Sequence, residues 1–126
     1  MVLRRVFFAS VLLLVSAASH AMEIKPFTAA LLAQAQASNQ PVALHFHADW
    51  CPTCRAQEKV LQSLKSEPGL DLTVMVVNYD TEKELKKRFN VRAQSTFVVL
   101  RGHQEWARLV GDTDPASIRT AFKSAP

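Results

Sequence analysis

Two cysteines with two residues between them constrain this chain most. Cys51 and Cys54 are its only cysteines, and they lie where an apolar, strand-like run gives way to a helical one. In the first turn of a helix, a cysteine meets unpaired backbone N–H groups and the positive end of the helix dipole. Both stabilise a thiolate and lower the pKa of about 8.5 of a free cysteine. Pro52 suits the first helical position because its φ is already fixed. The pattern predicts reversible thiol–disulfide exchange, with Cys51 as the attacking thiolate.

A CxxC pair also occurs in zinc sites and in structural disulfides. Tetrahedral zinc needs four ligands, and the sequence has no second CxxC pair or Cys/His cluster of matching spacing. A structural disulfide more often joins distant segments, because a longer closed loop gains more from the cross-link. Redox chemistry is therefore the favoured interpretation.

The N-terminal segment has the character of a secretory signal peptide. Arg4 and Arg5 supply a charged region, residues 6–15 are apolar apart from one serine, and Ser19-His20-Ala21 suits cleavage after Ala21. The alternative is a retained membrane anchor. The apolar run is shorter than the roughly 20 residues that span a bilayer, which favours a cleaved signal.

We therefore expect residues 1–21 to be removed and residues 22–126 to form one small domain with a single core. Export to the periplasm or the exterior would place the cysteines in an oxidising compartment, where a disulfide persists. Two of the 15 basic residues belong to the predicted signal, so the formal charge falls from +4 to about +2 on cleavage. No basic patch is interleaved with aromatic residues, so we expect no nucleic-acid partner.

Hydrophobic periodicity and turn residues predict alternating strands and helices in the domain. The expected strands are 23–25, 41–47, 72–78, 96–100 and 105–110. The expected helices run from about 27 to 38, over 51–66, over 82–89, and from 115 onward after a cap at Asp114. Residues 101–104 are expected to form a hairpin turn, and Phe97 and Trp106 are expected in the core.

The order of these elements, together with the motif, resembles the thioredoxin family over residues 24–122. Ala48-Asp49-Trp50-Cys51 matches the run into the family's nucleophile, 74–80 its central strand, and Val110-Gly111 the close of its last strand. The resemblance implies a thioredoxin fold: an α/β domain with a central mixed sheet of four to five strands and helices on both faces. Trp-Cys-Pro-Thr-Cys-Arg is similar to the motif of exported thioredoxins that reduce apocytochrome thiols. Ala-Asp-Trp-Cys also resembles the C-terminal domain of transmembrane electron-carrying disulfide reductases.

The resemblance implies roles for particular residues. Cys51 would be the exposed attacking thiolate, and Cys54 the buried thiol that resolves the mixed disulfide. Trp50 would shape the lip beside the sulfurs, unless it is only a core residue. The full set of residues expected to contact substrate is Trp50, Pro52, Thr53, Gln94, Ser95 and Thr96.

Ser95 marks a departure from the family, which has a cis-proline before the threonine of its fourth strand. We expect a trans peptide at Ser95, because a non-proline cis bond costs about 2.5–4 kcal/mol. The family uses the backbone beside this position to pair with an extended substrate segment, so docking is expected to differ here. In the family, this proline also keeps metal ions away from the thiolates. A serine would leave the site open to a metal ion or an iron–sulfur cluster.

His45 is a second departure. The family often has a buried carboxylate six residues before the nucleophile, and Val76 here replaces the lysine that partners it. A neutral imidazole can accept the proton of Cys54, since its ordinary pKa of about 6.5 lies near working pH. The alternative is a core histidine that only satisfies a hydrogen bond. His47 takes the place of a family aromatic residue and is expected to pack.

These features predict an exported thiol–disulfide oxidoreductase that acts on protein substrates, more as a reductase than as an oxidase. The chain has no glycine-rich phosphate loop, so we expect no cofactor. We expect electrons to arrive from the thiols of an upstream protein, such as a membrane thiol–disulfide reductase. We expect a monomer without a bound metal. Alternatives are a metal- or cluster-binding module that uses Cys51 and Cys54, and a thioredoxin-like interaction domain with little turnover.

Overall fold

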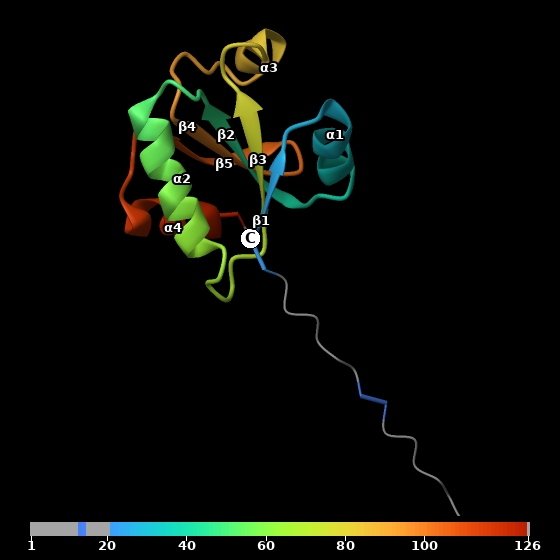
Figure 1. Cartoon of the computed structure of the whole chain (residues 1–126). Helices are drawn as coiled ribbons and strands as arrows, with labels where there is room; N and C mark the ends of the chain where they lie inside the picture. Colours follow the sequence, from blue (N-terminus) through green and yellow to red (C-terminus); the bar gives the residue numbers. More distant parts are fainter. Residues whose placement is uncertain (1–12, 15–20, 126) are drawn as a thin grey trace, which may run out of the picture.

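A five-stranded sheet with helices on both faces forms the domain (Figure 1). The computed structural model describes residues 13–14 and 21–125. Its strands are β1 (Glu23–Pro26), β2 (Pro41–His47), β3 (Thr73–Asn78), β4 (Thr96–Arg101) and β5 (Gln104–Val110). Its helices are α1 (Ala29–Ala37), α2 (Pro52–Leu64), α3 (Lys83–Arg88) and α4 (Pro115–Lys123). The predicted architecture of a mixed sheet of four to five strands is confirmed.

The strand order is β1-β3-β2-β4-β5. β1, β3 and β2 run parallel, whereas β4 is antiparallel to β2 and β5 is antiparallel to β4. Apart from the half-buried Pro41, every residue of β2 is buried, as expected of a strand with a neighbour on each side and helices above and below. His45 lies opposite Val76 in the register, as the match to the family's buried pair implies.

Each face of the sheet has its own hydrophobic core. Figure 1 shows α2 and α4 on one side of the sheet and α1 on the other. Leu61 and Leu64 of α2 pack with Ile118 and Phe122 of α4 against the first face. Leu32 of α1 and Leu85 of α3 pack on the second face. The strand residues of this second core are Val42, Leu44, Phe46, Met75, Val77, Val98 and Leu100. β2 and its neighbours are thus fixed from both sides, and so is the segment that follows β2.

The helix starts follow from their capping residues. Asp114 caps α4 by accepting the Ser117 N–H at 3.2 Å, as predicted, with Pro115 in the first turn. Cys51 caps α2, with the extended backbone of a cap residue, so the helix begins one residue later than predicted. Each predicted helix boundary lies within a few residues of the observed one. The small differences arise because helix ends depend on cap geometry.

The β4–β5 hairpin differs from the prediction in two ways. Arg101 and Gln104 pair with each other, so the turn is shorter than 101–104. Gly102 adopts a φ of +57° there, and a Cβ on it would lie 2.6 Å from the Asn39 side chain. Trp106 is 41% exposed, so its predicted place in the core is wrong, whereas Phe97 is buried as predicted. The physical reason is that β5 is an edge strand, with most of its residues exposed.

The predicted signal peptide, residues 1–21, lies almost entirely outside the described residues. Met22 is the first residue that packs into the core. Across residues 13–14 and 21–125, no helix combines the length and the apolar character needed to cross a membrane.

His45 is a fully buried titratable side chain in the middle of the sheet. Its ring stacks on Phe97 at a centroid distance of 4.4 Å, and its Nε2 lies 2.8 Å from Gln57 Oε1. Burial lowers the pKa of His45 to about 4, with the nearby His47 adding to the effect and the Gln57 hydrogen bond opposing it. The imidazole is therefore neutral at neutral pH.

This buried imidazole predicts a loss of stability in acid. Between pH 6.5 and about 4 the unfolded chain binds a proton that folded His45 does not, so the free energy of unfolding falls as the pH falls. From pH 7.5 to 4.5 the expected contribution is roughly 2–3 kcal/mol. Urea unfolding across this range should show a weaker pH dependence in His45→Gln than in the wild type. His103→Gln, in the exposed hairpin turn, is the matched control. An unchanged pH dependence in His45→Gln would contradict this assignment.

Candidate active site

The two thiols lie together at the N-terminus of α2, at the end of the sheet where β2 finishes. Both are free, and Cys51 Sγ accepts the backbone N–H of Cys54 at 3.1 Å. Cys51 is only 2% exposed and Cys54 is fully buried. The prediction of a buried Cys54 is confirmed, but that of an exposed Cys51 is wrong. The Cys51 side chain turns inward to cap the helix and to meet Ser95, which removes it from the surface.

The two thiols differ in acidity. Burial alone would raise the pKa of Cys51, but hydrogen bonds from the Cys54 side chain, the Ser95 hydroxyl and the backbone of Cys54 and Thr53 outweigh it and bring the pKa below its usual range. Burial and the neighbouring Cys51 raise the pKa of Cys54. The first thiolate of the reduced pair therefore forms on Cys51, as the position of the motif predicts.

Ser95 lies against both sulfurs. Its Oγ is 3.1 Å from Cys51 Sγ and 3.1 Å from Cys54 Sγ. The preceding peptide is trans, as predicted, and the residue has a φ of +62°, which is uncommon for a residue with a side chain. Its backbone is fully used: the N–H donates to Phe46 O at 2.9 Å, and the carbonyl accepts from Gly111 N at 2.9 Å. The Ser95 side chain is thus turned to the thiols, and its contact with substrate stays a prediction.

Gln57 was missed by the sequence analysis. Its Nε2 donates to the carbonyls of Ser95 and Asp112, at 3.0 and 2.9 Å. The amide oxygen therefore faces His45, and His45 Nε2 must carry the hydrogen that it accepts. The available signal was a polar residue on the buried stripe of α2, three residues after Cys54 and four before Leu61.

His45 does not hydrogen-bond to Cys54. Its Nε2 is committed to Gln57, and its Nδ1 has no hydrogen-bond partner in the described part of the chain. The neutral form expected from the sequence agrees with its lowered pKa. Proton uptake from Cys54 by His45 stays a prediction, without a direct contact to support it.

The other predicted site residues divide by exposure. Trp50 is 58% exposed, which excludes the alternative of a core tryptophan, and its Nε1 donates to Asp80 at 2.9 Å. It borders a hollow of about 580 Å³. Pro52 is exposed, and Thr53 and Gln94 are half-buried. Thr96 is buried, and its hydroxyl donates to Ala93 O at 2.7 Å; its predicted contact with substrate stays a prediction.

His47 is buried, as expected of a packing residue. Its ring nitrogens lie 3.7 Å from Asp49 and 3.3 Å from Glu58. Within residues 13–14 and 21–125, no three His, Cys, Asp or Glu side chains are grouped so that they would hold a metal. His47 and the two cysteines therefore do not form a ligand set there.

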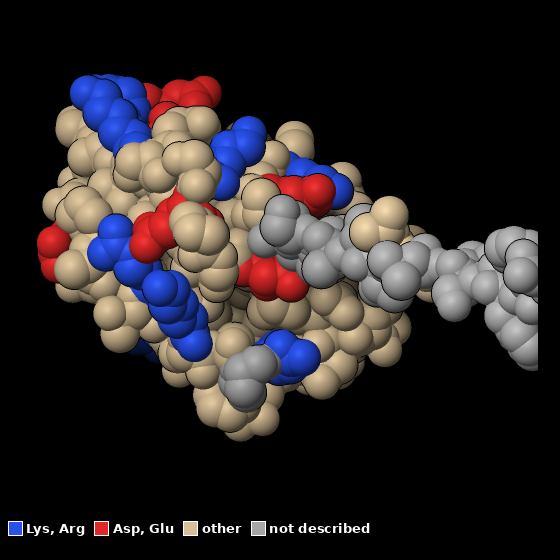
Figure 2. Space-filling model, turned by 90° about the horizontal axis from the view of Figure 1, so that it is seen from below, with Lys and Arg blue, Asp and Glu red and all other residues tan. Residues whose placement is uncertain are grey.

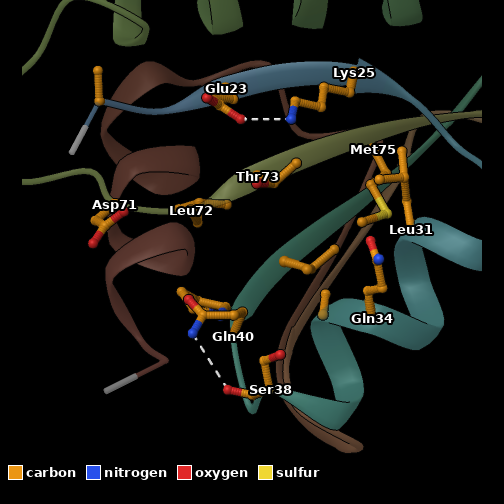
Figure 3. A pocket seen from close by; sticks show the side chains of 14 residues that line it. Glu23, Lys25, Leu31, Gln34, Ser38, Gln40, Asp71, Leu72, Thr73 and Met75 are labelled. Atoms are coloured by element: carbon orange, nitrogen blue, oxygen red, sulfur yellow. Dashed lines mark hydrogen bonds and ion pairs between the residues drawn. The ribbon is translucent and has the colours of Figure 1, made fainter.

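A second cavity, of about 720 Å³, lies at the opposite end of the sheet between α1 and the strands β1 and β3 (Figure 3). An ion pair between Lys25 and Glu23 borders it, at 2.9 Å. No thiol or imidazole is among the described residues that line it, so it is separate from the cysteine pair. On the face seen in Figure 2, basic and acidic side chains are interspersed, which does not make a surface of one sign.

Comparisons with known proteins agree with this site. A family model described as Thioredoxin matches residues 21–124. A thioredoxin of Mycobacterium bovis is 32% identical over 95 residues, which cover 75% of this chain and 82% of that protein. A bifunctional thioredoxin reductase/thioredoxin of Mycobacterium leprae is 33% identical over 90 residues, 71% of this chain but only 20% of that longer protein.

Solved structures give the same result. The structure of Trxlp from Edwardsiella tarda is 40% identical, with a TM-score of 0.74, and the match covers 79% of this chain and 98% of that one. A mutant thioredoxin from Halobacterium salinarum, 23% identical, matches 87% of this chain and 95% of its own with a TM-score of 0.70, which supports the fold. The architecture is the thioredoxin fold, and its paired cysteines are those of a thiol–disulfide oxidoreductase. The chain belongs to the thioredoxin family.

Proposed function

We propose that this protein is an exported reductase of protein disulfides that uses Cys51 and Cys54. The proposal rests on the surroundings of Cys51. Its buried sulfur is in hydrogen-bond contact with two neutral donors, the Ser95 hydroxyl and the Cys54 backbone N–H. Among the described residues, no lysine or arginine contacts either sulfur, and His45 is neutral. Strong oxidants depend on a highly stabilised reduced form, so a thiolate without a neighbouring cation favours a reductase.

The reaction takes two steps. The Cys51 thiolate attacks one sulfur of a substrate disulfide, which forms a Cys51–substrate bond and expels the other substrate sulfur as a thiolate. Cys54 then attacks Cys51 Sγ, which closes the Cys51–Cys54 disulfide and releases the second substrate thiol. Two electrons pass from the cysteine pair to the substrate. An upstream dithiol protein must then reduce the pair again, and a membrane thiol–disulfide reductase is the class that we propose.

Substrate docking is proposed at the surface formed by Trp50, Pro52 and Gln94. The first two are exposed next to the cysteines. The backbone N–H and C=O of Gln94 make no hydrogen bond with any described residue, whereas those of Ser95 are both used inside the protein. An extended substrate segment can therefore pair with Gln94 as an added strand. Because Cys51 is buried, such a segment must bring its disulfide down to the sulfur.

The exchange reaction is tested by trapping its intermediate. The reduced Cys54→Ser variant should form a stable mixed disulfide with a protein substrate such as insulin, since nothing resolves the Cys51–substrate bond. Cys51→Ser should form none and should reduce insulin only at the background rate of the added reductant. The adducts are counted by mass spectrometry. Ser63→Ala, on the exposed side of α2, is a control that should retain the wild-type rate. Full reduction of insulin by Cys51→Ser would exclude this function.

Export predicts a processed N-terminus. The full chain, produced in a bacterium with an outer membrane, should be recovered from the periplasm with Met22 as its first residue. N-terminal sequencing should then read Met-Glu-Ile-Lys. Replacing Ser19 and Ala21 with leucine should block cleavage, because the cleavage site requires small residues. An intact residue 1 in protein from the wild-type sequence, found only in the cytoplasm, would contradict export.

A further inference from the structure

The Ser95 hydroxyl lies next to both sulfurs and cannot make the same hydrogen bond to each of them. Its Oγ is 3.1 Å from each of them, and the residue is buried. A hydroxyl has one hydrogen to donate and two lone pairs that accept. It can therefore donate to one sulfur only, and it must accept from the other. The three atoms form a chain with a direction.

The surroundings of the sulfurs fix that direction. Cys51 Sγ already accepts the backbone N–H of Cys54 at the N-terminus of α2, which is where negative charge is stabilised. Cys54 Sγ lies 3.1 Å from Ser95 Oγ and also beside Cys51 Sγ, and burial raises the pKa of the Cys54 thiol, so it keeps its hydrogen when Cys51 has ionised. The hydroxyl hydrogen thus points to Cys51, and Ser95 Oγ has a lone pair in place to accept the S–H of Cys54. The Ser95 hydrogen bond is one of the causes that lower the pKa of Cys51.

We propose that Ser95 is a catalytic residue that stabilises the Cys51 thiolate and then carries the proton of Cys54 to the departing substrate sulfur. In resolution, Cys54 Sγ bonds to Cys51 Sγ and the bond from Cys51 to the substrate sulfur breaks. The Cys54 proton passes to Ser95 Oγ as the hydroxyl hydrogen passes to the departing sulfur, which starts about 2 Å from Cys51 Sγ. The products are the Cys51–Cys54 disulfide, a neutral substrate thiol and an unchanged serine.

The fold holds this hydroxyl in place from three directions. Ser95 N–H bonds to Phe46 of β2, and its carbonyl accepts from Gly111 after β5 and from Gln57 of α2. These contacts maintain the positive φ, a conformation that residues other than glycine seldom adopt and that is typical of functional sites. Gln57 acts through Ser95 and is a positioning residue.

No other titratable side chain among the described residues takes the place of Ser95. His45 bonds to Gln57 through Nε2, and its Nδ1 has no partner. His47 faces Asp49 and Glu58. Tyr79, which packs near the two cysteines, donates to Arg92 O. The stabilisation of the Cys51 thiolate does not depend on the proposed function, whereas the proton transfer rests on the proposed exchange function.

The first test measures the acidity of Cys51 without a substrate. Alkylation of Cys51 by iodoacetamide is followed by mass spectrometry from pH 5 to 10 in the wild type, Ser95→Ala, Ser95→Gly and the control Ser63→Ala. Both Ser95 variants should react roughly tenfold more slowly at pH 6, with an apparent pKa about one unit higher, since each loses a hydrogen bond to a charged sulfur. Ser63→Ala should match the wild type.

Glycine makes this test decisive about the hydroxyl. It adopts a positive φ without strain, so Ser95→Gly folds even if Ser95→Ala does not. A purely conformational role predicts normal reactivity in Ser95→Gly, and that result would overturn the proposal. Gln57→Leu should raise the apparent pKa of Cys51 less than Ser95→Gly does. The double variant should equal Ser95→Gly, because Gln57 acts through the hydroxyl.

The second test examines proton transfer. Mixed disulfides on Cys51 are prepared with an alkyl thiol and with the acidic aromatic thiol thionitrobenzoate, and release of each thiol by Cys54 is timed. In Ser95→Gly, release of the alkyl thiol should slow at least tenfold more than release of the aromatic thiol, which leaves without a proton. An equal loss for both would overturn the relay. Failure of the wild type to reduce any protein disulfide would instead overturn the proposed function and leave the alkylation result intact.

Discussion

The polar groups at the centre of this domain must find their hydrogen-bond partners inside the protein, because they have almost no contact with water. Ser95 satisfies both sulfurs through its hydroxyl. Gln57 accepts from His45 Nε2 and holds the Ser95 carbonyl, and among the described residues His45 Nδ1 has no partner. Each group therefore depends on the next, and the acidity of Cys51 depends on a network that begins at a backbone carbonyl after β5, that of Asp112. The fold determines the redox chemistry through this constraint.

The sheet explains why the network is rigid. β2 carries His45 and lies between β3 and β4, and Phe46 at its end accepts the N–H of Ser95. α2 starts directly after β2, so the strand that supports the histidine also positions the cysteines. The cores on the two faces fix β2 and α2 relative to each other. A thiolate at Cys51 thus meets donors that are already in place and need no rearrangement, which is the condition for electrostatic stabilisation in catalysis.

The sequence predicted the architecture well, because periodicity and turn residues report local structure directly. The strand 41–47 was predicted with its observed bounds, and the cap at Asp114 was correct. Exposure was predicted less well: Trp106 lies on an edge strand, and periodicity does not tell an edge from a centre. The site is partly non-local. Ser95 lies 44 residues from Cys51 in the chain, so only the folded structure shows its hydroxyl between the sulfurs.

The equilibrium reduction potential of the Cys51–Cys54 pair tests the central claim of a reductase most directly. Fluorescence of the adjacent, exposed Trp50 would be followed in thiol–disulfide buffers of defined potential. A thiolate stabilised by neutral donors alone predicts a value near that of thioredoxin, about −270 mV. A value near −120 mV, that of a strong disulfide donor, would contradict the account, because it would mean a far more stable reduced form than these hydrogen bonds provide.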